Sequence, residues 1–223
     1  MIDRLLAHLA PHLCCSCGAT GAVLCEDCKF NIVENAWLDC VICEKPCGPR
    51  GLCQKCIRTT PFEQVWVVGR RENELKQLID EYKFGSKRAA AVPIAELLHL
   101  RLPFLPPDAM VVGVPASAHG VRIRGFDHMQ LIVRELTRQR SLATAQPLKR
   151  ITNRELHTMS RENRIAMKDR LFELSGVATP EKVLLLDDIL TTGTTMLAAA
   201  ELLKKAGVQT IYAAVVARQP FDR

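Results

Sequence analysis

Cysteine placement is the feature that most constrains this chain of 223 residues. All ten cysteines lie between Cys14 and Cys56, and eight of them form four C-x-x-C pairs. Two intervening residues allow both sulfurs of a pair to face one tetrahedral metal ion. The spacing therefore predicts one or two structural zinc ions, each with four cysteine ligands. The expected ligands are Cys14, Cys17, Cys25, Cys28, Cys40, Cys43, Cys53 and Cys56.

Two other interpretations of these cysteines stay open at this point. A secreted disulfide scaffold can concentrate cysteines in the same way, and iron–sulfur clusters also use tetrahedral sulfur. Short gaps favour sequential sharing, in which the first two pairs hold one metal and the last two pairs another, but an interleaved arrangement is possible. Cys15 and Cys47 are left over, as small buried residues or spare thiols.

The cysteine-rich segment differs from the rest of the chain in its hydrophobic pattern. Residues 1–60 show little periodic hydrophobicity, and a segment this short cannot bury much core. A bound metal would then have to supply its folding energy. Because "RTTPFEQ" (58–64) is typical of a linker, we expect a zinc-ribbon domain over residues 1–60 and a second domain over residues 61–223.

Apolar strands alternate with helices from Val65 onward. We expect strands at 65–69, 110–115, 183–187 and 210–218, and helices at 72–84, 89–102, 129–140 and 194–207. Continuous apolar runs of this length are typical of strands that are buried on both faces. The alternation predicts an α/β fold with a parallel sheet flanked by helices. Ligands of such sheets bind beyond the carboxyl ends of the strands.

The stretch "VLLLDDILTTGTT" (183–195) places two aspartates and a small-residue loop at such a strand end. Gly193 permits a tight turn, and the loop amides before the next helix can converge on a phosphate. Asp187 and Asp188 can lie near a phosphate if they accept hydrogen bonds from sugar hydroxyls or hold Mg²⁺ alongside. These features predict a sugar phosphate ligand. The alternative is a solvated strand end with capping aspartates.

The same stretch resembles the motif of type I phosphoribosyltransferases that binds phosphoribosyl pyrophosphate (PRPP). The resemblance implies that Asp187 and Asp188 are the catalytic pair on the ribose hydroxyls, and that Mg²⁺ accompanies PRPP. It also implies a loop around the 5-phosphate, formed by Thr191, Thr192, Gly193, Thr194 and Thr195.

The motif together with the cysteine array resembles the ComF family of competence proteins and its GntX-type relatives over nearly the full length. Further matching stretches are "LIDEYKF" (78–84), "VVGVP" (111–115) and "RGF" (124–126). Four positions depart from the family pattern. Asp127-His128 replaces Asn-Gln, Met167 replaces Asn, and Glu44 follows the third cysteine pair where the family has Gly.

By the same resemblance, two segments would hold the pyrophosphate of PRPP. The first is the loop 114–120 with Pro115 and Ala116, and the second is a flap over 121–128 with Arg122 and Arg124. A departing pyrophosphate accumulates negative charge, which guanidinium groups and Mg²⁺ can neutralise. Solvated surface charge is the alternative interpretation of these arginines.

Positive charge is concentrated in residues 119–170, which contain twelve Lys or Arg and five Asp or Glu. Such a patch can bind a diphosphate or a nucleic-acid backbone, and an aromatic ring within it can stack on a base. An ordinary set of surface arginines is the alternative. The expected contacts to single-stranded DNA are Arg122, Arg124, Phe126, Arg161 and Arg164.

Three functions fit these features, because a fold does not determine a function. The family resemblance implies a cytoplasmic PRPP-binding protein that handles single-stranded DNA during natural transformation, with partners in the DNA-uptake machinery. The others are a phosphoribosyltransferase with an unidentified base or amine acceptor, and a PRPP sensor without turnover. Whether the protein is an enzyme therefore stays open. Membrane insertion is not expected, since no stretch approaches the roughly 20 apolar residues of a membrane span.

Overall fold

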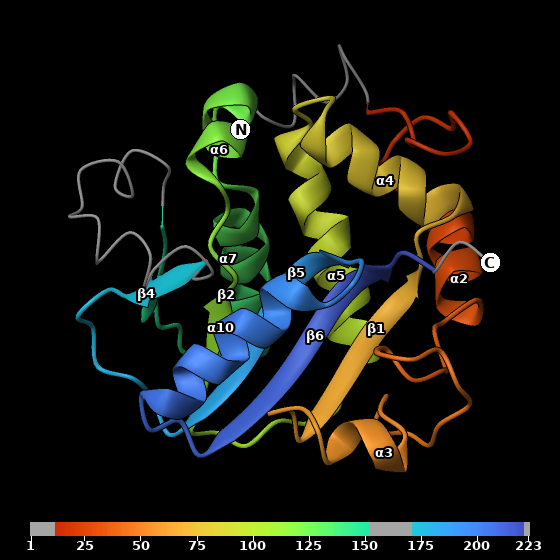
Figure 1. The fold of residues 1–223 in the computed structure, drawn as a ribbon. Helices are drawn as coiled ribbons and strands as arrows, with labels where there is room; N and C mark the ends of the chain where they lie inside the picture. The colour runs from red at the N-terminus through yellow and green to blue at the C-terminus, as the bar shows by residue number, and fades with distance from the viewer. Residues whose placement is uncertain (1–11, 152–170, 221–223) are drawn as a thin grey trace.

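A computed structural model of the chain describes residues 12–151 and 171–220 (Figure 1). The described elements are, in chain order, α2 (Glu26–Glu34), α3 (Gln54–Ile57), β1 (Gln64–Arg70), α4 (Asn73–Lys83), the 3₁₀ helix η1 (Arg88–Ala90), α5 (Ala91–Arg101), β2 (Ala109–Gly113), α6 (Ala118–Arg124), α7 (His128–Arg140), β3 (Leu148–Arg150), β4 (Phe172–Leu174), β5 (Lys182–Leu190), α10 (Thr194–Lys205) and β6 (Thr210–Arg218).

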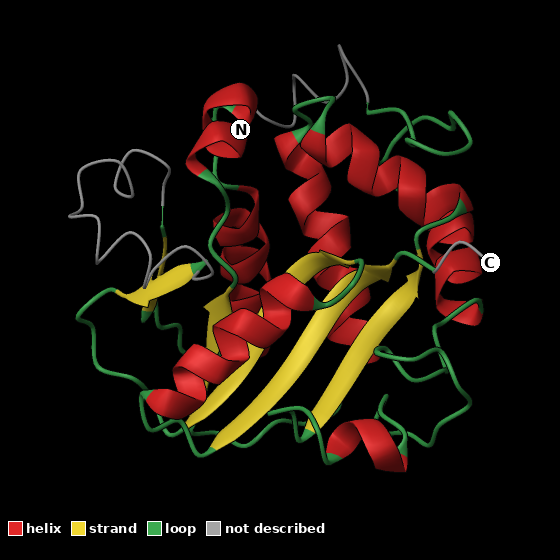
Figure 2. Ribbon diagram, in the orientation of Figure 1, coloured by secondary structure: helices red, strands yellow, loops and turns green. Residues whose placement is uncertain are grey.

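Four parallel strands form one sheet in the order β1-β6-β5-β2. Figure 2 shows α10 across one face of this sheet, whereas α5 and α7 cover the other. The alternating strands and helices expected from the sequence are thus confirmed, as is the α/β class. Strand β5 is longer than expected, because its ladder to β6 continues to the pair Leu190 and Arg218 after the ladder to β2 has ended at Leu186.

Successive residues of the strands point into two separate hydrophobic cores. In β1, Trp66 and Val68 face the core under α4, α5 and α7, whereas Val65 and Val67 face the core under α10. This alternation follows from the two-residue period of a β-strand, and burial on both sides explains the continuous apolar runs.

The cysteine-rich segment packs onto both sides of the sheet. Cys14 and Cys28 belong to the core under α4, α5 and α7, and Cys40 and Cys56 belong to the core under α10. Residues 12–60 therefore share their buried surface with the rest of the chain. The proposed boundary at residue 60 stays a prediction.

Several described elements were not expected from the sequence. They are α2, α3 and α6, which are short, and β3 and β4, which form a separate antiparallel pair. Among the described helices, none is both long and apolar enough to cross a lipid bilayer.

Candidate ligand cleft and cysteine clusters

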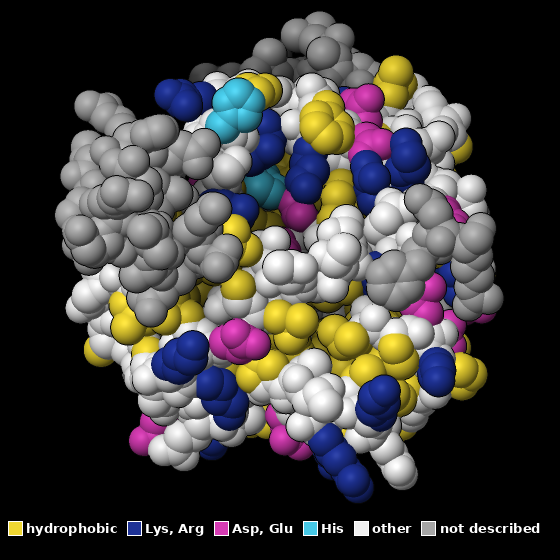
Figure 3. Space-filling model, viewed as in Figure 1, with side chains coloured by type: hydrophobic (Ala, Val, Ile, Leu, Met, Phe, Trp, Pro, Cys, Tyr) yellow, Lys and Arg dark blue, Asp and Glu magenta, His cyan; other side chains and the backbone are white. Residues whose placement is uncertain are grey.

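An open cleft of about 240 Å³ lies at the carboxyl ends of β2 and β5. The space-filling view shows acidic, basic and histidine side chains gathered around a hollow in this region (Figure 3). Two cavities of similar volume lie elsewhere, beside Trp37 and beside Asn31, and neither borders residues 187–195. The charged and ionisable residues that line the cleft are Lys83, Arg124, His128, Arg150, Asp187 and Asp188.

Asp188 is buried, and its carboxylate already has two partners in the protein. Oδ2 accepts a hydrogen bond from His128 Nε2 at 2.5 Å and pairs with Lys83 Nζ at 2.7 Å. Burial alone would raise the pKa of Asp188, but the hydrogen bond from His128 and the charge of Lys83 hold it well below its usual range. Asp188 is therefore an anion at neutral pH.

Asp187 keeps part of its surface open to the cleft. Its Oδ1 accepts a hydrogen bond from the backbone amide of Asp188 at 2.9 Å. Burial, and then the charge of Asp188, raise the pKa of Asp187 to about 8. The two adjacent carboxyl groups therefore differ in protonation, so that Asp187 can donate as well as accept a hydrogen bond.

The loop over residues 190–195 joins β5 to α10 at the rim of this cleft. Gly193 caps α10 with φ of +80°, a backbone conformation that glycine adopts without strain. The hydroxyls of Thr192 and Thr194 lie 2.9 Å apart, and Thr195 lines the cleft. Within residues 12–151 and 171–220, no protein group accepts a hydrogen bond from the amides of Thr192, Gly193 or Thr195. These donors, at the positive end of a helix, suit an anion.

Three cations from different elements reach the cleft. Lys83 ends α4, Arg124 ends α6 and Arg150 ends β3. Lys83 lies one turn after the buried Ile79, and this spacing places it on the inward face of α4. No local pattern in the sequence predicts Arg150 as a cleft residue, because tertiary packing brings the end of β3 to the cleft.

The departures at Asp127 and His128 have structural roles. The Asp127 side chain caps α7 by accepting hydrogen bonds from the amides of Met129 and Gln130. The buried His128 contacts Asp188, and its backbone carbonyl accepts a hydrogen bond from Tyr82 at 2.6 Å. Nothing in the sequence singles out His128 from the other histidines as a cleft residue.

The residues expected for the pyrophosphate and for DNA fall into four groups. Pro115, Ala116 and Arg124 line the cleft, whereas Arg122 is exposed and lies outside its lining. Phe126 is 8% exposed and its ring packs against Tyr82, so the expectation that it stacks on a base is corrected. Arg161 and Arg164 lie outside the described residues.

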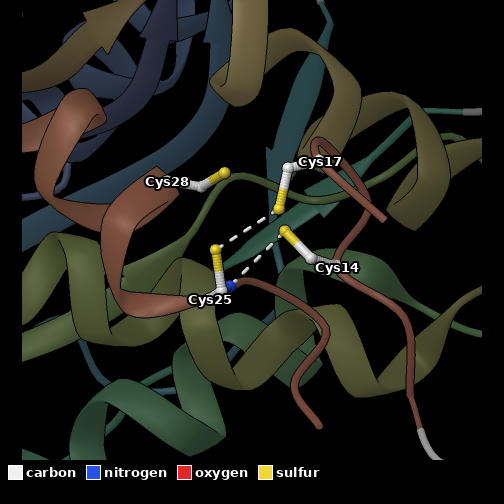
Figure 4. A group of neighbouring side chains, drawn as sticks. All are labelled: Cys14, Cys17, Cys25 and Cys28. Atoms are coloured by element: carbon white, nitrogen blue, oxygen red, sulfur yellow. Dashed lines mark hydrogen bonds between the residues drawn. The ribbon is translucent and has the colours of Figure 1, made fainter. Parts of the chain in front are cut away.

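The eight paired cysteines form two clusters, shared sequentially along the chain. Each cluster has four sulfurs within 4.8 Å of one another. Figure 4 shows the sulfurs of Cys14, Cys17 and Cys25 directed toward one another, with Cys28 beside them. The members are Cys14, Cys17, Cys25 and Cys28 in the first cluster, and Cys40, Cys43, Cys53 and Cys56 in the second.

This geometry fits one tetrahedral ion in each cluster. Zn–S bonds of about 2.3 Å place two sulfur ligands about 3.8 Å apart. Cys17 Sγ and Cys25 Sγ are 3.6 Å apart, and Cys43 Sγ and Cys53 Sγ are 3.7 Å apart. These separations are far longer than a disulfide, and all ten cysteines are free thiols. Both clusters could therefore bind zinc. Four protein ligands would leave no open position for catalysis.

One thiol in each cluster has an acidic pKa. Burial tends to raise the pKa of Cys14, but hydrogen bonds from the backbone at Cys17 and Cys25 outweigh this effect and lower it to about 6. A backbone hydrogen bond at Cys56 is the main cause that lowers the pKa of Cys53 to about 6. Backbone amides directed at sulfur favour the thiolate, which is the form that binds metal.

Comparison with known proteins gives independent support for this organisation. Residues 130–223, which contain β5, the loop and α10, match the phosphoribosyl transferase domain family. The chain is 27% identical to Competence protein F of Haemophilus influenzae over 71% of this chain and 75% of that protein. It is 27% identical to Competence protein ComFC of Streptococcus pneumoniae over 84% of each chain.

A third relative matches almost from end to end. The chain is 26% identical to DNA utilization protein YhgH of Salmonella typhi over 90% of this chain and 94% of that protein. With its two four-cysteine clusters ahead of a segment that matches the phosphoribosyl transferase domain, the chain is similar over most of its length to the competence protein ComF and DNA utilization protein YhgH group.

Proposed function

We propose that this protein binds PRPP with Mg²⁺ in the cleft and acts in the uptake and handling of single-stranded DNA during natural transformation. The observation that carries the proposal is the conjunction of Asp187, Asp188 and the 190–195 loop at one strand end. Loop amides suit the 5-phosphate, and the carboxyl groups suit the ribose hydroxyls. The DNA role rests on relatives whose names are competence and DNA utilization proteins.

The cations of the cleft support a diphosphate ligand. Lys83, Arg124 and Arg150 surround the acidic pair, and each can donate hydrogen bonds to phosphate oxygens. Because Lys83 pairs with Asp188, a ribose hydroxyl on Asp188 would have to share this carboxylate or displace the lysine. The displaced ammonium group would then be available to the pyrophosphate of the same ligand. Mg²⁺ bound with PRPP would neutralise part of its charge.

Calorimetric titration of the zinc-loaded chain with PRPP and Mg²⁺ tests the proposed ligand. We expect binding by the wild type and none by the double variant Asp187→Asn with Asp188→Asn. Asp108→Asn is the matched control, since Asp108 pairs with Lys182 at the opposite end of the sheet. Equal affinities of the double variant and the wild type would refute the site.

The DNA role has a separate test in the salt dependence of binding to an unstructured oligonucleotide. Removal of one side chain that neutralises a DNA phosphate should reduce the slope of log K against log salt concentration by about 0.7. Replacing the exposed Arg122 by Gln, together with Arg161 and Arg164, should weaken binding and flatten this slope. An unchanged slope would favour the function as a transferase or a sensor.

Release of pyrophosphate from PRPP separates a transferase from a sensor. A transferase should release pyrophosphate in the presence of a base or amine acceptor, whereas a sensor should bind PRPP without turnover. The three cations around the acidic pair suit pyrophosphate in either case.

A further inference from the structure

Arg218 is a fully buried cation outside the cleft, at the end of β6. Its side chain is 0% exposed. Its guanidinium donates to the carbonyls of Leu190 at 3.1 Å and Thr191 at 2.6 Å, which are the first two residues of the 190–195 loop. The planar guanidinium can bind several acceptors in fixed directions. Arg218 therefore holds the start of this loop from beneath.

Arg218 also donates to the carbonyl of the neighbouring Gln219, and two further partners come from the turn of the second cysteine cluster. Its Nε donates to the carbonyl of Val41 at 2.9 Å, and Nη2 pairs with Glu44 Oε1 at 3.3 Å. We call residues 40–44 the second knuckle, because they form the turn between Cys40 and Cys43 and the residue that follows it. One guanidinium thus joins this knuckle to the 190–195 loop.

The second knuckle also touches the loop directly. A Cβ atom at Gly193 would lie 3.7 Å from Cδ1 of Ile42. Ile42, which lies between the two cysteines of the knuckle, therefore packs against the glycine that turns the loop. Contacts at two points of the loop, at Leu190 and at Gly193, come from the same five-residue turn and its arginine partner.

Comparison of the two knuckles shows that Glu44 is an unusual choice. In the first knuckle (residues 14–18), the amide of Gly18 donates to the carbonyl of Cys14, and the φ angle of Gly18 is +75°. In the second knuckle, the amide of Glu44 donates to the carbonyl of Cys40, and the φ angle of Glu44 is +57°. Glycine adopts this conformation without strain, whereas glutamate is strained in it. The pairing of its carboxylate with Arg218 accounts for a strained residue at this position.

We propose that the second knuckle, through Glu44 and Arg218, holds the 190–195 loop in the conformation that receives the 5-phosphate of the ligand. Arg218 and Glu44 are then positioning residues for this loop. This inference rests on the proposed PRPP site. The first cluster has no such role, because no hydrogen bond among the described residues joins it to residues 187–195.

Two probes separate the halves of the ligand. Ribose 5-phosphate requires the loop, whereas Mg²⁺-pyrophosphate requires only the cations on the other side of the cleft. Calorimetry on the zinc-loaded chain should show Glu44→Gly weakening ribose 5-phosphate about tenfold with pyrophosphate affinity unchanged. Loss of general stability would weaken both probes alike. Gly18→Ala is the matched control, since it introduces strain at the same turn of the first knuckle.

The inference would be overturned if Glu44→Gly bound ribose 5-phosphate as tightly as the wild type. It would also be overturned if Gly18→Ala lost as much affinity for ribose 5-phosphate as Glu44→Gly. Zinc content, measured by atomic absorption, should remain that of the wild type in both variants. If the wild type binds neither probe, that result refutes only the PRPP site. Amide hydrogen exchange requires no ligand, so it tests the positioning role in that case as well. Glu44→Gly should accelerate exchange in residues 190–195, and unchanged exchange there would reject the positioning role.

Discussion

The two cysteine clusters share one local design but differ in what they support. Each places its sulfurs around one tetrahedral site, and each first pair makes the same hydrogen-bonded turn. The first cluster packs on the face covered by α4, α5 and α7. The second packs on the α10 face and contacts the 190–195 loop through Arg218. The clusters therefore have different consequences for the cleft, although their ligand sets are the same.

The difference indicates how a four-cysteine cluster can contact a cleft loop to which it contributes no residue. The second knuckle contains no cleft residue, yet its Val41 carbonyl and Glu44 carboxylate are the partners of a buried arginine beneath the loop. The first cluster affects the cleft less directly, because it packs beside α4, the helix that carries Lys83. Substitutions in each cluster and at Arg218 can test these two connections separately.

Loss of metal should have the largest effect, and the effect should differ between clusters. We expect Cys40→Ser with Cys43→Ser to lower the thermal unfolding midpoint by about 10 °C more than Cys14→Ser with Cys17→Ser. Disordering of the second knuckle would remove partners from the buried Arg218, which costs about 3–5 kcal/mol. Calorimetric scans of the two double variants measure the difference. Equal midpoints would mean that the link to Arg218 contributes little to stability.

A conservative change at Arg218 should have the next largest effect. Arg218→Lys should lower the free energy of unfolding by about 3 kcal/mol, because an ammonium group cannot reach carbonyls in three directions at once. Arg70 is a close control: it pairs with Arg218 in the β1–β6 register and also lies over the Trp37 ring. Arg70→Lys, at a half-exposed position, should change stability by less than about 0.5 kcal/mol. Urea unfolding of both variants measures this contrast, and similar losses would contradict it.

A third prediction concerns the acidic pair, and it separates the cleft itself from the second cluster. The pKa of Asp187 is raised from 3.8 to about 8 in the folded chain, so folding takes up a proton between these values. The contribution of Asp187 to the free energy of unfolding therefore falls as the pH rises from about 4 to about 8. Asp187→Asn lacks this dependence, so its stability relative to the wild type should increase over the same range.

Urea unfolding of the wild type and Asp187→Asn at several pH values measures this difference. Asparagine keeps the oxygen that accepts the Asp188 amide, so the local backbone should be preserved. Parallel stability curves from about pH 5 to about pH 8 would mean that Asp187 is already ionised at neutral pH. Glu44→Gly should leave this pH dependence unchanged, because Glu44 does not line the cleft that contains the acidic pair.

Features that arise from neighbouring residues could be predicted from the amino-acid sequence. Apolar runs predicted the four main strands, and the helical stripe of α4 and the position of α10 were also correct. C-x-x-C spacing predicted two four-cysteine clusters, because both sulfurs of each pair come from one turn. The position of the acidic pair and the small loop at a strand end followed from local pattern as well.

The tertiary structure alone decided which distant residues meet. Lys83 and His128 pair with Asp188, although each lies far from it along the chain. β5 continues past Asp187 because β6 supplies a partner as far as Arg218. Arginine is mostly exposed in proteins, yet carbonyls and Glu44 from separate segments bury Arg218. Ion pairs, strand length and burial depend on contacts between remote segments, and no local pattern encodes those contacts.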